Sequence, residues 1–142
     1  MIVTRGALVS AVACVQPDRR PKLTLDIRWI PIGTGRLALW HRPARRHFTA
    51  LREAGVTCLL TLLSESEGAR TIGGQAEAAA LGWIWLPMHG AREPDASARP
   101  ALDAGLAYAS NLLDHGDSLL IHCSAGIHRT GMFAYAPCAI VA

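Results

Sequence analysis

The stretch "SLLIHCSAGIHRTG", Ser118 to Gly131, decides the fold of this chain. Its first part is an apolar run of strand length, and its last part opens a candidate helix after a loop that contains glycine. A loop at this position presents backbone N–H groups at the positive end of the helix dipole, where oxyanions bind. The stretch therefore predicts a strand, an anion-binding loop and a helix in direct succession.

The same loop carries the side chains for chemistry at phosphorus. It can turn Cys123 and Arg129 toward one centre, so that a thiolate touches phosphorus while the guanidinium binds two oxygens. Gly126 allows a tight turn and a close approach to the ligand, and the Thr130 hydroxyl can hydrogen-bond the sulfur. Helix N-termini and nearby cations lower the pKa of a cysteine. We therefore predict that Cys123 is a thiolate at neutral pH.

The sequence "HCSAGIHRTG" matches the signature HCxxGxxR[ST]G and so resembles the cysteine-based protein tyrosine and dual-specificity phosphatases. The resemblance implies that Cys123 is the nucleophile that forms a phosphocysteine, that Arg129 binds phosphate and that Thr130 assists. His122 is expected to support the loop through hydrogen bonds rather than to act as a base. The residues expected to bind the substrate phosphate are Ser124, Ala125, Gly126, Ile127, His128 and Arg129. No metal or organic cofactor is implied, because the loop supplies the positive charge.

The general acid is the first departure from the family. In the family it is an aspartate in an upstream loop, and the matching stretch here is "WLPMHGAREPD", with Gly90 at the expected aspartate position. Asp95, Glu93 and His89 are the candidates to replace it. Asp95 is preferred because it repeats the residue type of the family, although it can equally cap the helix that follows.

Strands and helices alternate before this stretch, which predicts an α/β fold with a mainly parallel central sheet and helices on both faces. Gly33 and Gly35 mark a turn, and the apolar runs suit strands buried on both faces. The expected strands are 56–63, 83–87 and 118–123, the expected helices are 45–54, 75–81 and 100–113, and residues 64–74 and 88–99 are expected to be loops.

The two ends of the chain look different from this regular middle part. We expect an N-terminal extension of uncertain order over residues 1–30 and a phosphatase-like domain over residues 31–142. Residues 7–15 weakly resemble an export signal, so export is the alternative to the expected cytoplasmic location. Pro137 predicts that the last helix ends near Ala136, so the C-terminal helices expected from the family are apparently truncated.

Composition excludes several classes of protein. The 142 residues are 51% hydrophobic with a mean hydropathy of +0.23, which suits one domain with a real core. No apolar run reaches the roughly 18 residues that span a bilayer. The net charge of +3 is dispersed, which argues against nucleic-acid binding. The four cysteines have no spacing typical of zinc ligands.

Together these features predict a phosphatase that hydrolyses phosphotyrosine in proteins, with phosphoserine and phosphothreonine as further substrates. Two alternatives stay open. Gly90 at the acid position suits a non-catalytic phosphate-binding protein, and the loop chemistry also suits a phosphatase of phosphoinositides or other small phosphate esters. Protein substrates are preferred, because Ile127 is neutral and His128 only partly basic where lipid-directed relatives carry basic residues. The sequence predicts neither the particular phosphoprotein nor the oligomeric state.

Overall fold

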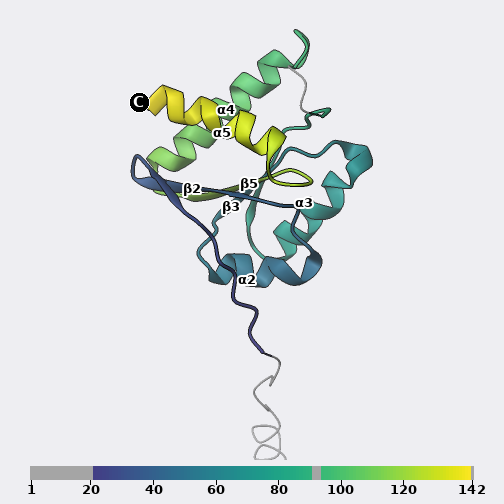
Figure 1. Cartoon of the computed structure of the whole chain (residues 1–142), viewed down its shortest axis with the longest axis vertical. Coiled ribbons are helices and arrows are strands. Elements are labelled where there is room, and N and C mark those ends of the chain that lie inside the picture. Colours follow the sequence, from purple (N-terminus) through teal and green to yellow (C-terminus); the bar gives the residue numbers. More distant parts are fainter. Residues whose placement is uncertain (1–20, 91–93, 142) are drawn as a thin grey trace, which may run out of the picture.

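A five-stranded sheet lies at the centre of the computed structural model, which describes residues 21–90 and 94–141 (Figure 1). The strands are β1 (Ile30–Ile32), β2 (Gly35–Trp40), β3 (Cys58–Thr61), β4 (Gly82–Trp85) and β5 (Ser118–His122). Their order across the sheet is β1-β2-β5-β3-β4. β1 is antiparallel to β2, and the other neighbours are parallel. The predicted α/β fold with a mainly parallel sheet is confirmed.

Helices cover both faces of this sheet (Figure 1). The α-helices are α2 (Phe48–Glu53), α3 (Ala69–Ala78), α4 (Arg99–Asp114) and α5 (His128–Val141), and short 3-10 helices form η1 (Arg45–His47) and η2 (Glu65–Glu67). α2 and α3 pack on one face, and α4 and α5 pack on the other. None of the helices described is long and apolar enough to cross a membrane.

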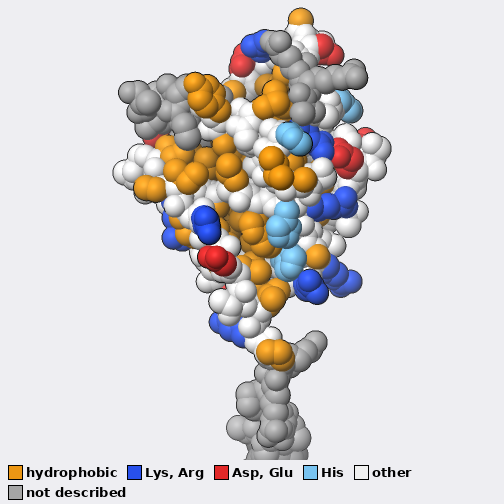
Figure 2. All heavy atoms as spheres, in the orientation of Figure 1, with side chains coloured by type: hydrophobic (Ala, Val, Ile, Leu, Met, Phe, Trp, Pro, Cys, Tyr) orange, Lys and Arg blue, Asp and Glu red, His pale blue; other side chains and the backbone are white. Residues whose placement is uncertain are grey.

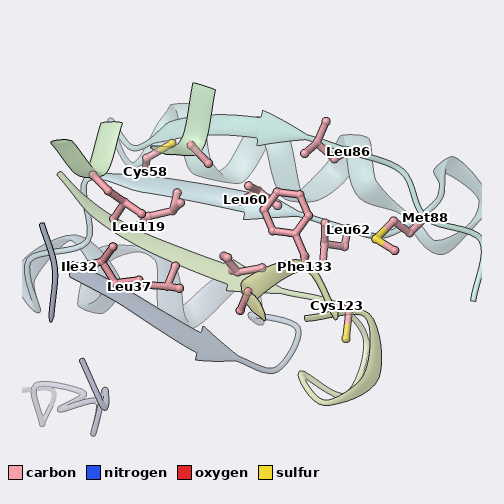
Figure 3. Packing of buried hydrophobic residues seen from close by; sticks show 14 residues of the cluster. Ile32, Leu37, Cys58, Leu60, Leu62, Leu86, Met88, Leu119, Cys123 and Phe133 are labelled. Carbon is pink, nitrogen blue, oxygen red and sulfur yellow. The ribbon is translucent and has the colours of Figure 1, made fainter. Parts of the chain in front are cut away.

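The middle positions of the central strands β3 and β5 are apolar because both faces of these strands are buried, and polar residues stand only at their ends. In β5, Leu119 and Ile121 join the core under α4 and α5, whereas Leu120 between them joins the core under α2 and α3. All three side chains are fully buried. Figure 3 shows the first of these cores, with Cys123 at its edge beside the loop that follows β5. This packing explains the continuous apolar runs that predicted a parallel sheet.

The prediction of a loop over residues 64–74 is wrong. η2 and most of α3 occupy this stretch, and α3 ends at Ala78, earlier than the expected helix over residues 75–81. Two glycines lower the helix propensity here, but Gly73 is where α3 meets β4. A Cβ at Gly73 would lie 2.6 Å from ring carbons of Trp83. Close packing of helix on strand therefore outweighs the weak propensity.

The prediction that Pro137 ends the last helix is also wrong, because α5 continues to Val141. A proline inside a helix removes one hydrogen bond to the carbonyl four residues earlier and is unfavourable there, but this cost does not end α5. The long helix predicted after residue 99 and the turn at Gly33 are confirmed. The candidate acid Glu93 and the export-like segment at residues 7–15 lie outside the described residues.

Candidate active site

The loop between β5 and α5 lies where the parallel strands end. β5 is the middle strand, and its last residue His122 pairs with Trp40 of β2 and Thr61 of β3. Gly126 has a φ of +73°, and a Cβ there would lie 2.3 Å from the carbonyl oxygen of Trp40. Only glycine fits this turn, because a side chain would be strained and would collide with the end of β2.

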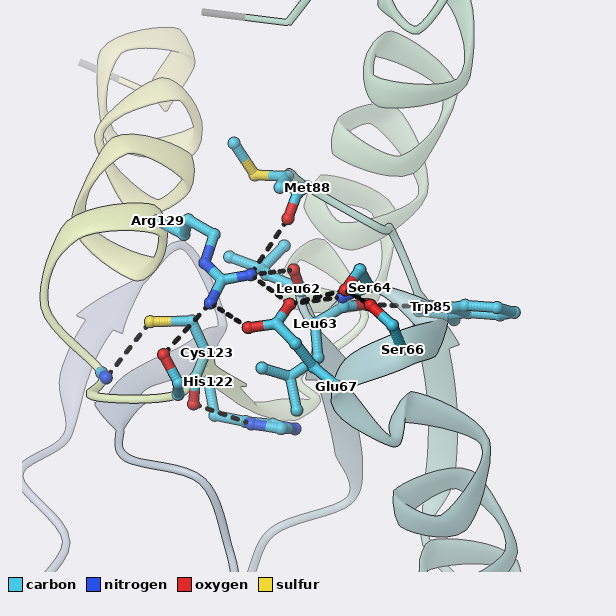
Figure 4. Close-up of polar contacts among 12 residues, drawn as sticks. Leu62, Leu63, Ser64, Ser66, Glu67, Trp85, Met88, His122, Cys123 and Arg129 are labelled. Atoms are coloured by element: carbon cyan, nitrogen blue, oxygen red, sulfur yellow. Dashed lines mark hydrogen bonds and ion pairs between the residues drawn. The ribbon is translucent and has the colours of Figure 1, made fainter. Parts of the chain in front are cut away.

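Cys123 lies at the foot of this loop, and the residue is 2% exposed. The backbone N–H of Gly126 donates to Sγ at 3.2 Å (Figure 4). Burial raises the pKa of the thiol, but the nearby Thr130 hydroxyl and the backbone N–H groups of Thr130, Gly126 and Ile127 outweigh burial, so the pKa lies below its ordinary value. The loop thus favours the thiolate form, and ionisation of Cys123 at neutral pH stays a prediction.

The hydroxyl of Thr130 lies near the sulfur of Cys123 and lowers the pKa of the thiol. Its Oγ1 is fully buried and has no close hydrogen-bond partner among the described residues, yet its hydroxyl acts on Cys123 strongly enough to lower the pKa of the thiol. A buried hydroxyl without a partner is uncommon in folded proteins. The group is therefore available to donate to the sulfur during a reaction.

Arg129 points back across the loop and is held on all sides (Figure 4). Nη1 donates to Oε2 of Glu67 at 2.8 Å and to the carbonyl of Met88 at 3.0 Å, and Nη2 donates to Oε1 of Glu67 at 2.8 Å and to Oγ of Ser124 at 3.1 Å. The guanidinium side chain is 8% exposed. These bonds fix its orientation before any ligand arrives.

The ion pair with Glu67 shifts both partners toward their charged forms. Hydrogen bonding to Arg129 lowers the pKa of Glu67 to about 2, helped by the backbone and hydroxyl of Ser64. Hydrogen bonding to Glu67 in turn raises the pKa of Arg129, and a contact with Cys123 adds to this. Since Glu67 occupies the two terminal nitrogens, the edge of the guanidinium that faces Ser124 and Cys123 is the one that can bind phosphate oxygens.

His122 is buried below the loop and is the last of three side chains linked in series by hydrogen bonds, after Trp83 and Thr61. Trp83 Nε1 donates to Thr61 Oγ1 at 2.9 Å, and Thr61 Oγ1 lies 2.9 Å from His122 Nε2. Nδ1 of His122 lies 3.3 Å from the carbonyl oxygen of Cys123, which can only accept, so Nδ1 carries the proton and Nε2 accepts from Thr61. Burial lowers the pKa of His122 to about 4. The buried ring thus links the end of β3 to the start of the loop, and its supporting role in the site stays a prediction.

Among the described residues, neither Asp95 nor His89 forms a hydrogen bond to the phosphate loop, unlike Arg129 and its partners. Asp95 is exposed, and its Oδ1 accepts hydrogen bonds from Ser97 Oγ at 2.7 Å and from the N–H of Ala98 at 2.9 Å. These bonds, Ser97 first, lower the pKa of Asp95. These bonds hold the turn before α4, whose N-cap position is occupied by Ala98 without a side-chain hydrogen bond, so Asp95 does not cap the helix. His89 follows Met88, whose carbonyl binds Arg129, and lines a cavity of about 330 Å³ with Asp95.

Three residues of this site were missed by sequence reasoning: Glu67, Thr61 and Trp83. Ser64 and Glu67 have the spacing of a helix-capping pair, which could have predicted the turn at η2. Nothing in that spacing points to Arg129, which is 62 residues away. Within the described residues, no three His, Cys, Asp or Glu side chains gather into a metal site.

Comparison with solved structures supports the fold. The chain is similar to kinase-associated phosphatase with its catalytic-site cysteine replaced by serine (13% identity, 86% of this chain and 77% of that one, TM-score 0.74). It is similar to Tk-PTP in the active form (21% identity, 75% and 69%, TM-score 0.65). It is also similar to P. aeruginosa TpbA in complex with phosphotyrosine (19% identity, 84% and 68%, TM-score 0.51). No curated protein sequence matches the chain.

A family match covers most of the chain, including the central sheet and the phosphate loop. Residues 33–138 match the family described as Tc-R-P, polymorphic toxin system, DSP-PTPase phosphatase. The match includes Cys123, Arg129 and Glu67. The chain therefore belongs to this family of cysteine-based phosphatases.

Proposed function

We propose that this chain hydrolyses phosphotyrosine in phosphoproteins through a phosphocysteine intermediate, with phosphoserine and phosphothreonine as weaker substrates. The observation that carries this proposal is the sulfur of Cys123, which has a lowered pKa and lies beside the guanidinium of Arg129. Such a thiolate attacks phosphorus without a separate base. The phosphotyrosine complex of P. aeruginosa TpbA supports an aryl phosphate as the substrate.

In the proposed reaction, Sγ of Cys123 forms a bond to phosphorus while the bond from phosphorus to the tyrosine oxygen breaks. Backbone N–H groups of residues 124–129 and the edge of Arg129 that faces Ser124, once Nη2 has released Oγ of Ser124, bind the three non-bridging oxygens and stabilise their charge in the transition state. Water then attacks the phosphocysteine and releases inorganic phosphate. The Thr130 hydroxyl donates to the departing sulfur, which makes it a better leaving group.

The tyrosine oxygen needs a proton as it leaves, and we assign this proton to Asp95, with His89 and Glu93 as the alternatives. Asp95 must give up its hydrogen bonds to Ser97 and Ala98 to act, and those bonds favour its ionised form. Proton donation is therefore weak at neutral pH. A phenol is a much better leaving group than an alkoxide, so the site suits phosphotyrosine better than phosphoserine.

The test is hydrolysis of an aryl phosphate and of a phosphotyrosine peptide by the wild type and by Cys123→Ser. We expect the wild type to release phenol, and the variant to release none while it still binds inorganic phosphate in calorimetry. Wild-type rates in Cys123→Ser would overturn the nucleophile assignment. Phosphate binding without release of phenol by the wild type would identify a non-catalytic binding protein instead. Activity on small esters alone would identify the small-ester alternative.

A further inference from the structure

The segment that follows β2 is unusually basic. Between residues 41 and 47, in "HRPARRH", five of the seven side chains are arginine or histidine. We call these five the basic rim: His41, Arg42, Arg45, Arg46 and His47. All but the half-buried His47 are exposed, whereas Pro43 inside the segment and Phe48 after it are buried and anchor the backbone.

The basic rim begins at the wall of the phosphate site. The N–H of Arg42 donates to the carbonyl of Ser124 at 3.2 Å. A Cβ on Gly126 would lie 2.7 Å from the backbone nitrogen of His41. On the face shown in Figure 2, histidine side chains lie in the middle, with arginine or lysine side chains beside them on the right. A substrate with its phosphate in the loop therefore passes the basic rim.

Ring packing gives this segment a defined shape. The rings of Trp40 and His41 stack with centroids 4.1 Å apart, and His47 meets Trp40 edge-on at 5.2 Å. Nδ1 of His47 accepts a hydrogen bond of 3.0 Å from the N–H of Ala44. Because the backbone is already ordered, binding of a ligand here costs little conformational entropy of the backbone.

The arginines of the basic rim have no carboxylate partner within residues 21–90 and 94–141. The two glutamates that precede α3 are already engaged, Glu65 by Arg70 and Glu67 by Arg129. Arg42 reaches this region, since its Nη2 lies 2.9 Å from where a Cβ of Gly68 would be. Three guanidinium groups thus remain to bind an external anion.

Charge on the basic rim at neutral pH comes mainly from the arginines. Burial, followed by the nearby charges of Arg46 and His41, lowers the pKa of His47 below its ordinary value. Arginine stays protonated at every pH at which the protein folds. The rim is therefore a permanent cationic surface and not one that depends on histidine protonation.

We propose that the basic rim binds carboxylates that flank the phosphotyrosine in an acidic peptide substrate. This inference rests on the proposed phosphotyrosine activity and adds a sequence preference to it. A guanidinium binds a carboxylate through two parallel hydrogen bonds. Arginines spread from residue 42 to residue 46 suit an extended peptide that passes the loop, rather than one compact anion held at a single point.

The test compares two phosphotyrosine peptides of equal length, one with Glu and Asp on both sides of the phosphotyrosine and one with Gln and Asn there. We expect the wild type to have about a 10-fold higher kcat/KM for the acidic peptide at low salt, since three exposed ion pairs contribute modestly each. The preference should shrink at about 0.5 M salt, where screening shortens the reach of exposed charges.

Two variants locate the effect. The first variant combines Arg45→Gln with Arg46→Gln, and the second is Arg42→Gln. Each should reduce the ratio of kcat/KM for the acidic peptide to kcat/KM for the neutral peptide by about 3-fold or more. The matched control, Lys22→Gln with Arg52→Gln, removes two positive charges beside the end of α2, where Lys22 pairs with Glu53. It should keep the wild-type ratio. Thermal unfolding of each variant checks that it is folded.

Each outcome separates this inference from the function on which it rests. Wild type that cleaves both peptides equally, or variants of the basic rim that keep the full preference, would overturn the inference and leave the phosphotyrosine activity standing. An equal loss of the preference in the control would show that the preference depends on net charge alone. That result would also overturn the inference. Cleavage of neither peptide would overturn the proposed function and the inference together.

Discussion

Glu67 holds both terminal nitrogens of Arg129, with each oxygen–nitrogen distance at 2.8 Å. The arginine belongs to the first turn of α5 and the glutamate to η2, on the other side of the phosphate loop. This pairing leaves the remaining edge of the guanidinium toward Cys123 and Ser124. Glu67 is thus placed to position Arg129, the arginine that we propose binds phosphate.

Glu67→Gln should lower kcat/KM for an aryl phosphate by about 10²-fold, because a guanidinium free to swing by about an ångström binds the transition state poorly. Glu65→Gln is the matched control, since Glu65 forms an exposed pair with Arg70 one turn away. Steady-state kinetics on both variants measure the difference. Equal rates in the two variants would show that Glu67 does not position Arg129.

The same pair should make stability depend on pH in the acid range. The pKa of Glu67 is about 2 in the folded chain, below its ordinary value of 4.5, so its contribution is fully present above pH 4.5 and is lost as pH falls toward 2. We expect Glu67→Gln to be less stable than wild type by about 2 kcal/mol at pH 7, and the gap to narrow by pH 3. Urea unfolding at pH 7, 5 and 3 measures it. A gap that stays constant over this range would contradict the ion pair.

Cys58 and Cys123, the two cysteines whose surroundings the structure describes, should differ sharply in reactivity. The loop lowers the pKa of Cys123, whereas burial, with the nearby Asp117, raises the pKa of Cys58 to about 12. We expect iodoacetamide at pH 6 to alkylate Cys123 about 100-fold faster than Cys58, as followed by mass spectrometry of the peptides. Thr130→Val should slow the reaction of Cys123 by about 10-fold. Similar rates at both cysteines would exclude a thiolate at Cys123.

Thr61 should be needed for its hydroxyl rather than its shape. Thr61→Val leaves Trp83 Nε1 and His122 Nε2 without partners, which should lower the free energy of unfolding by about 1–3 kcal/mol. The loop then loses its fixed histidine, so alkylation of Cys123 should shift to higher pH. Thr61→Ser keeps the hydroxyl and should restore the wild-type pH profile. If Thr61→Val keeps the wild-type pH dependence of Cys123 alkylation, Thr61 contributes only through packing.

The leaving group should affect the rate strongly if proton donation is weak. We expect aryl phosphates to react much faster than alkyl phosphates, with rates that fall as the pKa of the phenol rises. If Asp95 is the acid, Asp95→Asn should steepen this dependence, since a positioned acid contributes about 10²- to 10⁴-fold. A series of substituted phenyl phosphates measures the slope. An unchanged slope in Asp95→Asn would leave Asp95 with a role only in the turn before α4, and His89→Gln would then be measured in the same series.

The sequence by itself determined the parts of the site that are close together in the chain. Cys123, Gly126, Arg129 and Thr130 lie within eight residues, so a strand followed by a tight loop and a helix brings them together whatever surrounds them. The central strands are equally local, because burial on both faces favours a continuous apolar run in their middle positions. These short-range rules predicted the parallel sheet and the phosphate loop.

Only the tertiary structure decided which distant side chains support that loop. Pairing of β3 with β5 sets Thr61 opposite His122, and pairing of β3 with β4 brings Trp83 into the same chain of hydrogen bonds. The turn at η2 then carries Glu67 to Arg129. These contacts depend on strand register and on how α3 packs against Trp83, and both follow from the packing of the whole core rather than from the residues on either side of each position.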